Sequence, residues 1–314
     1  MNMNIRVVTG TAAGLVFLAA AFLAFHHYTE THVETDDAQI AGHLHPVTSR
    51  IPGAVTNVFV HDNQVVKKGE PLFMLDDRNF FHTQQKDEAI LARDKARLEV
   101  SMANIDKDGT RIRLTRRESE RTDRLSRKAF ATASRLDRDR AAYREALATL
   151  KADTAQQKVI ESIIRQDEAT VAIDRLNLRH TIVRAPVDGR ITGKTVEKGQ
   201  YLVPGQVVGY IVPFRMWIIA NYKETDLSNI HPGDPVRITV DAIPGKTFRG
   251  RVDSIQQSTG AVLSLLPPEN ATGNYTKVVQ RVPVKILLDP ASDTGHQLRL
   301  GMSVLPVVLP GNRP

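Results

Sequence analysis

The sequence predicts an elongated, multidomain protein of mixed α+β class, and three observations support this fold. A short motif with glycine turns and alternating apolar residues occurs twice, at 53–72 and 189–208. Between the copies, residues 79–180 contain no proline and a single glycine, Gly109, which favours long helices. Residues 214–314 return to short apolar runs separated by Pro and Gly, as in a small antiparallel β-barrel. We therefore expect a split β-domain, interrupted by a helical hairpin and followed by a barrel.

The N-terminal segment predicts a membrane anchor. Residues 7–25 carry no charge, and a stretch of that length can cross a bilayer as a helix. Arg6 precedes the stretch and acidic residues follow it, so we expect 1–6 in the cytoplasm and the rest of the chain outside it. A cleaved signal peptide is the alternative, because Ala19–Ala21 offers a small-residue cleavage site. We expect residues 26–45 to be a linker that adds a strand to the barrel.

The two motif copies predict the halves of one domain, at 46–78 and 181–213. About twenty residues of strand cannot bury a core alone, so the halves must pack on each other. That packing would bring Leu75 close to Thr181 and force the intervening residues out and back. Aligned without gaps, the copies share their turn glycines and three residues between them: Gly53/Gly189, Gly69/Gly205, Thr56/Thr192, Val60/Val196 and Gln64/Gln200.

Residues 79–180 predict an antiparallel α-helical coiled coil with its tip at about 121–134. Arms of roughly 48 residues would reach about 70 Å. In the returning half, one seven-residue register holds Leu136, Tyr143, Leu150, Gln157, Ile164, Val171 and Leu178, and Leu147, Ile160 and Ile163 widen the apolar stripe. The outgoing half has a looser stripe of Ile90, Leu91, Leu98, Met102, Ile105, Ile112, Leu114 and Leu125.

The basic charge of the chain lies at the far end of this hairpin. Residues 111–144 hold 12 Lys and Arg against 5 Asp and Glu, an excess equal to the net charge of +7 of the whole chain. Few aromatic residues accompany them, and the segment is expected outside the cytoplasm, so nucleic acid is not the expected partner. A solvated coiled-coil surface and a docking tip for an acidic partner both remain open. The basic residues nearest the turn are Arg116, Arg117, Arg124, Arg127 and Lys128.

The C-terminal third predicts short antiparallel strands and one exposed loop. The strand-like runs are Met216–Ala220, Val236–Val240, Gly250–Ile255, Val278–Leu288 and Ser303–Leu309. Residues 261–274 are apolar and then glycine-rich, which favours a loop over the barrel. The loop would expose Leu265, Leu266, Asn270, Asn274 and Tyr275, which makes these residues candidates for contact with another molecule.

Residue patterns typical of enzymes do not assemble in this sequence. The strings Gly193–Thr195 and Gly245–Thr247 lack the first glycine of a phosphate-binding loop. The adjacent carboxylates Asp36 and Asp37 would point to opposite faces of an extended chain. The histidines do not supply three or four converging metal ligands, and the chain has no cysteine. We expect a protein that is not an enzyme and has no catalytic, cofactor-binding or metal-binding residues.

Several irregular strings carry a family resemblance. The split domain resembles lipoyl and biotinyl carrier domains, but its first half runs into helix where a carrier would place its acceptor lysine. With the anchor, the hairpin and the barrel, the chain is similar to the HlyD-like membrane fusion proteins, the periplasmic adaptors of Gram-negative export systems, and to their EmrA-type subgroup. The strings that carry this likeness are Glu34–Ala38 (ETDDA), Pro52–Gly53, Asp62–Gly69 (DNQVVKKG), Arg184–Gly189 (RAPVDG), Trp217–Leu227 (WIIANYKETDL), Ser264–Pro268 (SLLPP) and Asn270–Val284 (NATGNYTKVVQRVPV).

The resemblance implies an adaptor in a tripartite multidrug efflux system. It would be a single-pass inner-membrane protein with most of its chain in the periplasm, and it would form a homo-oligomer, a trimer or a hexamer. Its partners would be an inner-membrane major-facilitator exporter and a TolC-type outer-membrane channel. The tip pattern of the family maps to Arg121, Leu125 and Thr132, with Thr in place of Ser. The loop at 261–274 would be a candidate contact with the transporter or with a drug. An adaptor for another cargo, such as aromatic acids or a secreted peptide, and a coiled-coil scaffold without an export role are the alternatives.

Overall fold

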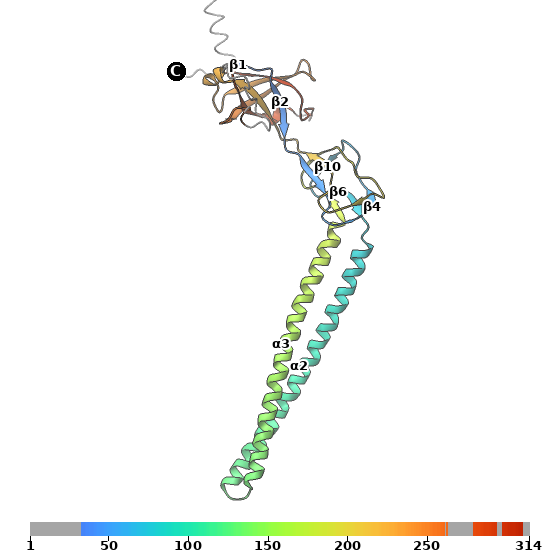
Figure 1. The fold of residues 1–314 in the computed structure, drawn as a ribbon, viewed down its shortest axis with the longest axis vertical. Helices are drawn as coiled ribbons and strands as arrows, with labels where there is room; N and C mark the ends of the chain where they lie inside the picture. The colour runs from blue at the N-terminus through green and yellow to red at the C-terminus, as the bar shows by residue number, and fades with distance from the viewer. Residues whose placement is uncertain (1–32, 261, 263–278, 294–296, 310–314) are drawn as a thin grey trace, which may run out of the picture.

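The computed structural model describes residues 33–260, 262, 279–293 and 297–309. These residues form three parts arranged in line, with a β-sheet domain at one end, a smaller β-domain in the middle and a helical hairpin at the other end (Figure 1). The mixed α+β class and the elongated hairpin are therefore confirmed. Over these ranges, no helix is long and apolar enough to cross a membrane. The expected anchor at 7–25 and the candidate loop residues Leu265, Leu266, Asn270, Asn274 and Tyr275 lie outside the described residues.

The middle domain is a sandwich of two four-stranded sheets, and both sheets mix strands from the two motif copies. The strand orders are β3-β10-β8-β5 and β7-β6-β4-β9. Val65 of the first copy pairs with Arg190 of the second, and Gly53 pairs with Leu202. Neither half can therefore complete a sheet without the other. The strands are β3 (His45–Thr48), β4 (Gly53–Val58), β5 (Val65–Val66), β6 (Pro71–Leu75), β7 (Ile182–Arg184), β8 (Gly189–Thr192), β9 (Tyr201–Leu202) and β10 (Val207–Val212).

The repeated glutamine makes the same contact in both copies. The side-chain oxygen Oε1 of Gln64 accepts a hydrogen bond from the backbone N–H of His61 at 2.9 Å, and Oε1 of Gln200 accepts one from Glu197 at 3.1 Å. Each bond closes a turn between two strands. The repeat in the sequence is thus a repeat of turn geometry.

At one of the two repeated glycine positions, the backbone conformation requires glycine in both copies. Gly69 and Gly205 have φ values of +86° and +83°, in the left-handed region that glycine adopts without strain. The other repeated pair is not equivalent. A Cβ atom at Gly189 would overlap the carbonyl oxygen of Val212, whereas one at Gly53 would lie 3.4 Å from Cβ of Leu75, a tight but possible contact.

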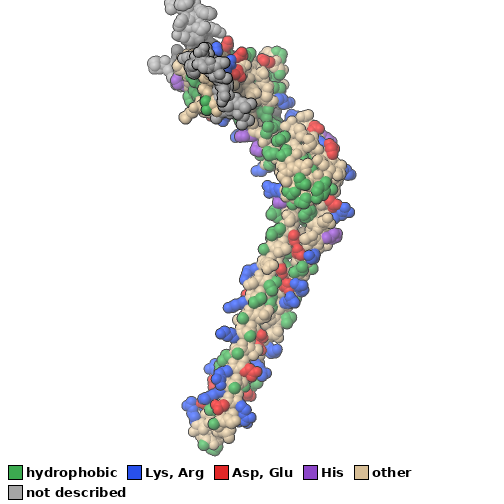
Figure 2. All heavy atoms as spheres, viewed as in Figure 1, with side chains coloured by type: hydrophobic (Ala, Val, Ile, Leu, Met, Phe, Trp, Pro, Cys, Tyr) green, Lys and Arg blue, Asp and Glu red, His purple; other side chains and the backbone are tan. Residues whose placement is uncertain are grey.

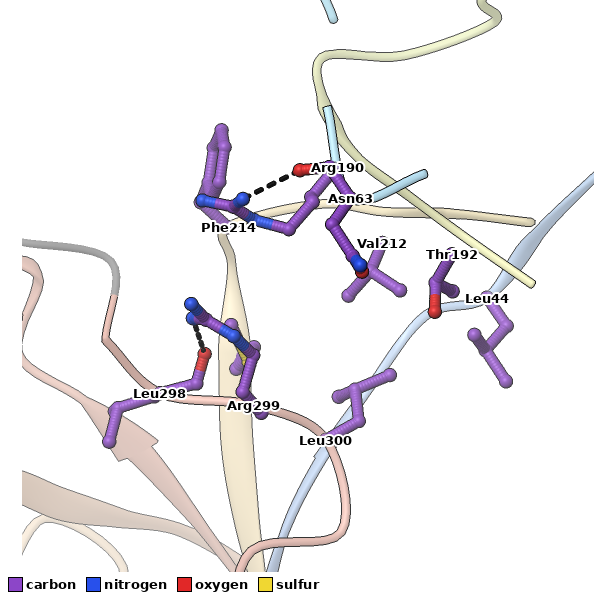
Figure 3. A pocket seen from close by; sticks show the side chains of 10 residues that line it. Leu44, Asn63, Arg190, Thr192, Val212, Phe214, Leu298, Arg299 and Leu300 are labelled. Atoms are coloured by element: carbon purple, nitrogen blue, oxygen red, sulfur yellow. Dashed lines mark hydrogen bonds between the residues drawn. The ribbon is translucent and has the colours of Figure 1, made fainter. Parts of the chain in front are cut away.

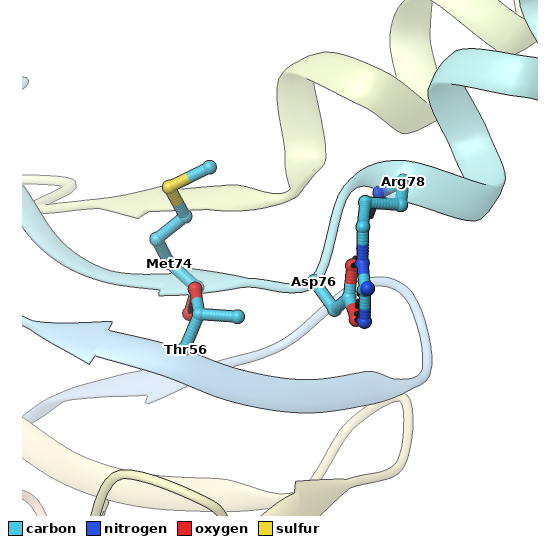
Figure 4. A network of polar contacts seen from close by, with 4 residues as sticks. All are labelled: Thr56, Met74, Asp76 and Arg78. Carbon is cyan, nitrogen blue, oxygen red and sulfur yellow. Dashed lines mark hydrogen bonds and ion pairs between the residues drawn. The ribbon is translucent and has the colours of Figure 1, made fainter.

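The hairpin consists of α2 (Arg78–Arg127) and α3 (Ala133–His180), and it starts and ends at one place on the sandwich. The backbone N–H of Leu75 donates to the carbonyl oxygen of Thr181 at 2.8 Å, so the two ends meet as the sequence predicts. At the start of α2, the carboxylate of Asp76 accepts hydrogen bonds from Nε and Nη2 of Arg78 at 3.0 and 2.6 Å (Figure 4). Beside them, the hydroxyl of Thr56 donates to the carbonyl oxygen of Met74 at 3.1 Å and links β4 to β6.

The contact between the two helices confirms most members of both predicted stripes and corrects each stripe at its exposed positions. Ile164 and Val171 of the predicted α3 register are buried and its other members are half-buried, but Leu147 and Ile163 are 40% and 39% exposed. On α2, Met102, Leu114 and Leu125 are exposed, whereas the other members of the predicted stripe are half-buried: Ile90, Leu91, Leu98, Ile105 and Ile112. The buried side chains of α2 are short and polar instead, because they face α3 directly while the larger apolar residues flank the seam: Asp94, Ser101, Asp108, Thr115 and Thr122.

The end domain is built on a seven-stranded antiparallel sheet of order β1-β15-β12-β13-β14-β11-β2. The sheet curls so that Ile40 of β2 donates to the carbonyl oxygen of Met302 at 3.0 Å, and Gln39 forms a bridge with Ser303 just before β15. Each of the five predicted strand-like runs overlaps one strand among the described residues. The strands are β1 (Val33–Glu34), β2 (Ala38–Gly42), β11 (Met216–Lys223), β12 (Pro235–Val240), β13 (Thr247–Ile255), β14 (Arg281–Leu288) and β15 (Val304–Val308), with short 3-10 helices at Glu224–Asn229 and Pro290–Ser292.

Candidate functional sites at the hairpin tip and the domain joint

The tip turn is held by a compact set of backbone hydrogen bonds. After α2 ends at Arg127, the carbonyl oxygen of Leu125 accepts from the N–H groups of Lys128 and Phe130 at 3.1 and 2.9 Å. Ala129 sits between them at a φ of +61°, a left-handed conformation that costs a residue with a Cβ roughly 1 kcal/mol or more. The surrounding bonds offset this cost, so the turn presents its side chains in a defined arrangement.

Thr132 has a structural role at this turn. It is the N-cap of α3, and its hydroxyl accepts a hydrogen bond from the backbone N–H of Arg135 at 3.3 Å. A serine hydroxyl would make the same bond, so the helix cap does not distinguish Thr from Ser at this position.

The tip exposes one aromatic side chain that the sequence analysis missed. Phe130 is 80% exposed, and Leu125, at 40%, is the other large apolar side chain exposed at the turn. Phe130 is also the only aromatic residue within 111–142, and this isolation was the available signal. Arg121 lies one turn earlier on α2 and is exposed as well. The structure thus places Arg121, Leu125 and Thr132 in one region and adds Phe130 to them.

The basic residues near the tip are exposed, and some of them form ion pairs. Figure 2 shows Lys and Arg side chains gathered around the far end of the hairpin, with acidic side chains among them. Arg116 pairs with Glu120 at 2.8 Å, and Arg127 and Arg140 both pair with Asp123, at 2.8 and 2.7 Å. The other predicted basic residues, Arg117, Arg124 and Lys128, are exposed. The arrangement would attract an acidic surface.

A second candidate site lies at the joint between the sandwich and the end domain. A cavity of about 330 Å³ opens there between side chains of both domains (Figure 3). Its apolar lining includes Leu44, Phe214 and Leu300. Two guanidinium groups reach it, and each also donates to a backbone carbonyl, Arg190 to Asn63 at 2.6 Å and Arg299 to Leu298 at 2.8 Å. An apolar lining that also includes two cations suits a molecule that joins an apolar body to an anionic group.

No metal centre is apparent in the part of the chain that the structure describes, where no group of three or more His, Asp or Glu side chains converges. His43 instead stacks edge-on against Trp217, with ring centroids 4.9 Å apart, and lies 6.1 Å from His45. These histidines contribute aromatic packing at the joint.

Comparison with known proteins identifies the class. The model of the barrel-sandwich hybrid domain of RND membrane fusion proteins matches residues 45–213, and that of the CusB-like β-barrel domain matches 215–272. The structure of MacA from Actinobacillus actinomycetemcomitans has the same fold, with a TM-score of 0.64 at 20% identity over 88% of this chain and 79% of that one. The three parts in line, with the split sandwich in the middle, are those of a periplasmic-adaptor fold.

Two curated relatives specify the class further. The fatty acid resistance protein FarA of Neisseria gonorrhoeae is 36% identical over 86% of this chain and 74% of its own length. The colistin resistance protein EmrA of Acinetobacter baumannii is 30% identical over 92% of this chain and 90% of its own length. The chain therefore belongs to the membrane fusion protein family, and the EmrA-type resemblance is confirmed. Members of this family work as adaptors with inner-membrane transporters and outer-membrane channels.

Proposed function

We propose that this protein is a non-enzymatic adaptor that joins an inner-membrane major-facilitator exporter to a TolC-type outer-membrane channel. Residues 7–25 would anchor it in the inner membrane, with the remainder in the periplasm, and copies would assemble into a trimer or a hexamer. The observation that carries the proposal is the exposed tip at the end of the hairpin opposite the end domain (Figure 1). At about 1.5 Å per residue, the 50 residues of α2 hold that tip about 75 Å from the sandwich.

The chemistry of the tip supports a protein partner. Exposed aromatic side chains on a rigid turn lose little conformational entropy on binding and often dominate interface energies. Phe130 and Leu125 meet this description, and the surrounding cations add long-range attraction to an acidic rim. We therefore assign Arg121, Leu125, Phe130 and Thr132 to the channel-facing surface, with Thr132 acting through the helix cap.

A site-specific crosslink tests the proposal, because the chain has no cysteine. We would replace Lys128 by Cys, attach a photo-crosslinker, irradiate intact cells and identify the adducts by mass spectrometry. The matched control is Glu99→Cys, an exposed position midway along α2. An outer-membrane channel captured from position 128 but not from 99 would support the bridging role. Self-adducts alone from both positions would contradict it and favour a scaffold that does not reach the outer membrane.

The joint cavity favours one cargo class within this function. FarA is named for fatty acid resistance, and the cavity here combines apolar walls with Arg190 and Arg299. We propose that amphipathic carboxylates are among the exported molecules and contact this joint. Calorimetric titration of the full-length protein with decanoate should show weaker binding for Arg190→Gln and Arg299→Gln. The control Arg215→Gln, at an exposed residue outside the cavity lining, should bind like the parent protein; equal affinity in all of them would refute the assignment.

A further inference from the structure

The seam of the hairpin contains a ladder of facing aspartates. The hydrogen bond from Oγ1 of Thr122 to Oδ2 of Asp139, at 2.7 Å, fixes the register of the two helices, and in that register Asp87 lies opposite Asp174 and Asp108 opposite Asp153. The pairs share one antiparallel register, since each step along α2 is matched by an equal step back along α3. The same register places Asp94 opposite Asp167.

Two of these layers bring carboxyl groups together without a basic residue between them. Asp108 is only 5% exposed, and Asp174 is half-buried. Within the described chain, the buried side-chain oxygens that accept no hydrogen bond are Oδ2 of Asp108, Oδ2 of Asp174 and, opposite Asp94, Oδ2 of Asp167. Two ionised carboxylates in this geometry would repel each other and leave buried acceptors unsatisfied, and a single proton held between them relieves both costs.

The nearby cations do not neutralise these two layers from within the seam. Lys107 adjoins the layer of Asp108 and Asp153, and it lowers the pKa of Asp153 less than Asp108 raises it. Lys86 lies 3.9 Å from Asp87, but its side chain is largely exposed. It is also the only cation among the groups that act on Asp174.

The flanking charged groups are paired elsewhere. Arg175 binds Glu88 at 2.7 Å, on the outside of the layer of Asp87 and Asp174. Lys95 binds Glu168 at 3.0 Å, next to the layer of Asp94 and Asp167.

The layer of Asp94 is different and serves as an internal comparison. Arg93 and Arg97 bind its carboxylate at 2.8 and 3.1 Å, so Asp94 is a compensated anion. These arginines lower the pKa of Asp94, with the Arg93 hydrogen bond as the largest cause. Asp94 is therefore stabilised in the charged state, although Oδ2 of Asp167 opposite it accepts no hydrogen bond, whereas no ion pair of the described residues binds Asp108, Asp153 or Asp174.

We propose that the pairs Asp87–Asp174 and Asp108–Asp153 each hold one shared proton in the folded hairpin, so that mild acid stiffens the hairpin and neutral to alkaline solution loosens it. This inference rests on the geometry of the seam and does not depend on the adaptor function. The hairpin would thus couple the order of its tip to the pH of the solution around it.

The sign of the effect follows from the protonation equilibrium. The pKa of Asp153 is raised, first by its hydrogen bond with Asp108, and the pKa of Asp174 is raised, first by burial. A carboxyl whose pKa is higher in the folded state binds its proton more tightly there, so stability increases as the pH falls through the folded pKa. Below about pH 4, the loss of ionised Asp94 and Glu88, whose pKa values are lowered, reverses the trend.

Thermal unfolding of the full-length protein in detergent tests the proposal. The helical circular dichroism signal at 222 nm, to which α2 and α3 contribute most, would be followed between about pH 8 and about pH 5 with EDTA present. We expect the midpoint of the parent protein to rise by several degrees as the pH falls. In Asp153→Asn, whose amide mimics the protonated acid, the midpoint should be higher at pH 8 and much less dependent on pH.

Two further variants make the result decisive. Asp174→Asn should act in the same way through the second pair, so the test survives if one variant folds poorly. Asp106→Asn removes the same charge at an exposed position of α2 and should retain the full pH dependence of the parent. A midpoint that is flat or falls on acidification in the parent, or an equal pH response in Asp153→Asn, Asp174→Asn and Asp106→Asn, would overturn the proposal. So would stabilisation at pH 8 by Mg²⁺ or Ca²⁺ that Asp153→Asn abolishes, because the pair would then hold a cation.

Discussion

The backbone N–H of Leu75 lies 2.8 Å from the carbonyl oxygen of Thr181 and donates a hydrogen bond to it, although the whole hairpin separates the two residues along the chain. Thr181 is 1% exposed, and its hydroxyl donates to the carbonyl oxygen of Leu178 at 2.7 Å. The last turn of α3 is therefore fixed directly to the edge of the sandwich. This fixed root allows the position of the tip to be set by the sandwich.

The two repeated glycines should respond differently to the same substitution. Gly189→Ala should destabilise the sandwich by about 1 to 3 kcal/mol, because its Cβ would overlap the carbonyl oxygen of Val212. Gly53→Ala, at the equivalent position of the first copy, should cost less than about 1 kcal/mol, because its Cβ would meet only Leu75 at 3.4 Å. Urea unfolding followed by the fluorescence of a probe attached to the sandwich would measure both. Equal losses would show that the close approach at Gly189 relaxes.

Thr132 should act on docking through the helix cap. Thr132→Ala removes the hydrogen bond from the N–H of Arg135 and should cost the hairpin about 1 kcal/mol, with faster hydrogen exchange in the first turn of α3. Thr132→Asp keeps a capping oxygen and should retain most of the order of that turn. This role predicts that export activity across the Ala, Asp and Ser variants of Thr132 parallels the order of the first turn of α3. Export that is lost in Thr132→Asp despite an ordered turn would instead indicate direct contact of the hydroxyl with a partner.

Phe130 should be an energetic centre of the tip. Phe130→Ala should reduce crosslinking from position 128 and export by at least about tenfold, without change in the unfolding midpoint, because the side chain is 80% exposed and packs little within the monomer. Leu125→Asp should likewise abolish export and leave folding and membrane anchoring intact. The control is Phe59→Ala, a half-exposed phenylalanine on the sandwich. Unimpaired export in Phe130→Ala would remove this residue from the docking surface.

The root of the hairpin should depend on pH in the acid range through Asp76. The hydrogen bonds from the side chain and the backbone N–H of Arg78 lower the pKa of Asp76 from its ordinary value of 3.8 to about 2. A carboxyl with a lowered pKa contributes stability above its ordinary pKa and loses that stability as the pH falls towards the folded value. Hydrogen exchange at the first turn of α2, corrected for the intrinsic rate, should therefore accelerate on acidification from about pH 4 to about pH 2. In Asp76→Asn the protection should be lower throughout and should lack this acid-dependent step.

The sequence was sufficient for the parts of the fold that rest on periodic patterns. The repeat at Gly53 and Gly189 predicted the split sandwich, and the lack of proline between residues 79 and 180 predicted the hairpin. Turn glycines could be recognised because positive φ restricts the choice of residue, as at Gly69 and Gly205.

The seam of α2 could not be predicted from apolar periodicity. Asp94, Ser101 and Asp108 occupy the buried register there, although Met102 is more apolar than any of them and lies exposed. A search for apolar stripes overlooks such a register because it scores hydrophobicity alone. At these positions the side chain must instead be small and must fit its partner on α3. The repeated seven-residue spacing of Asp87, Asp94 and Asp108 was the signal that was available.

The joint cavity and the exposure of Phe130 depend on tertiary arrangement. Leu44 and Leu300 are far apart in the sequence and reach one cavity only because both domains meet there. Phe130 could equally have packed back onto the helices, and its exposure follows from the turn conformation at Ala129.

The interleaving of strands in the sandwich sets the order in which the chain can mature as it is synthesised. Residues 46–78 cannot complete a sheet until β8 and β9 have been synthesised. The strand edges of the first half therefore remain unpaired during synthesis of the hairpin. Contacts near the turn at Ala129 are local and can form first, and zippering of α2 against α3 then carries Thr181 to Leu75 by short successive steps. Formation of the hairpin thus assists the folding of the sandwich, because many fast local steps replace the slow closure of one long loop.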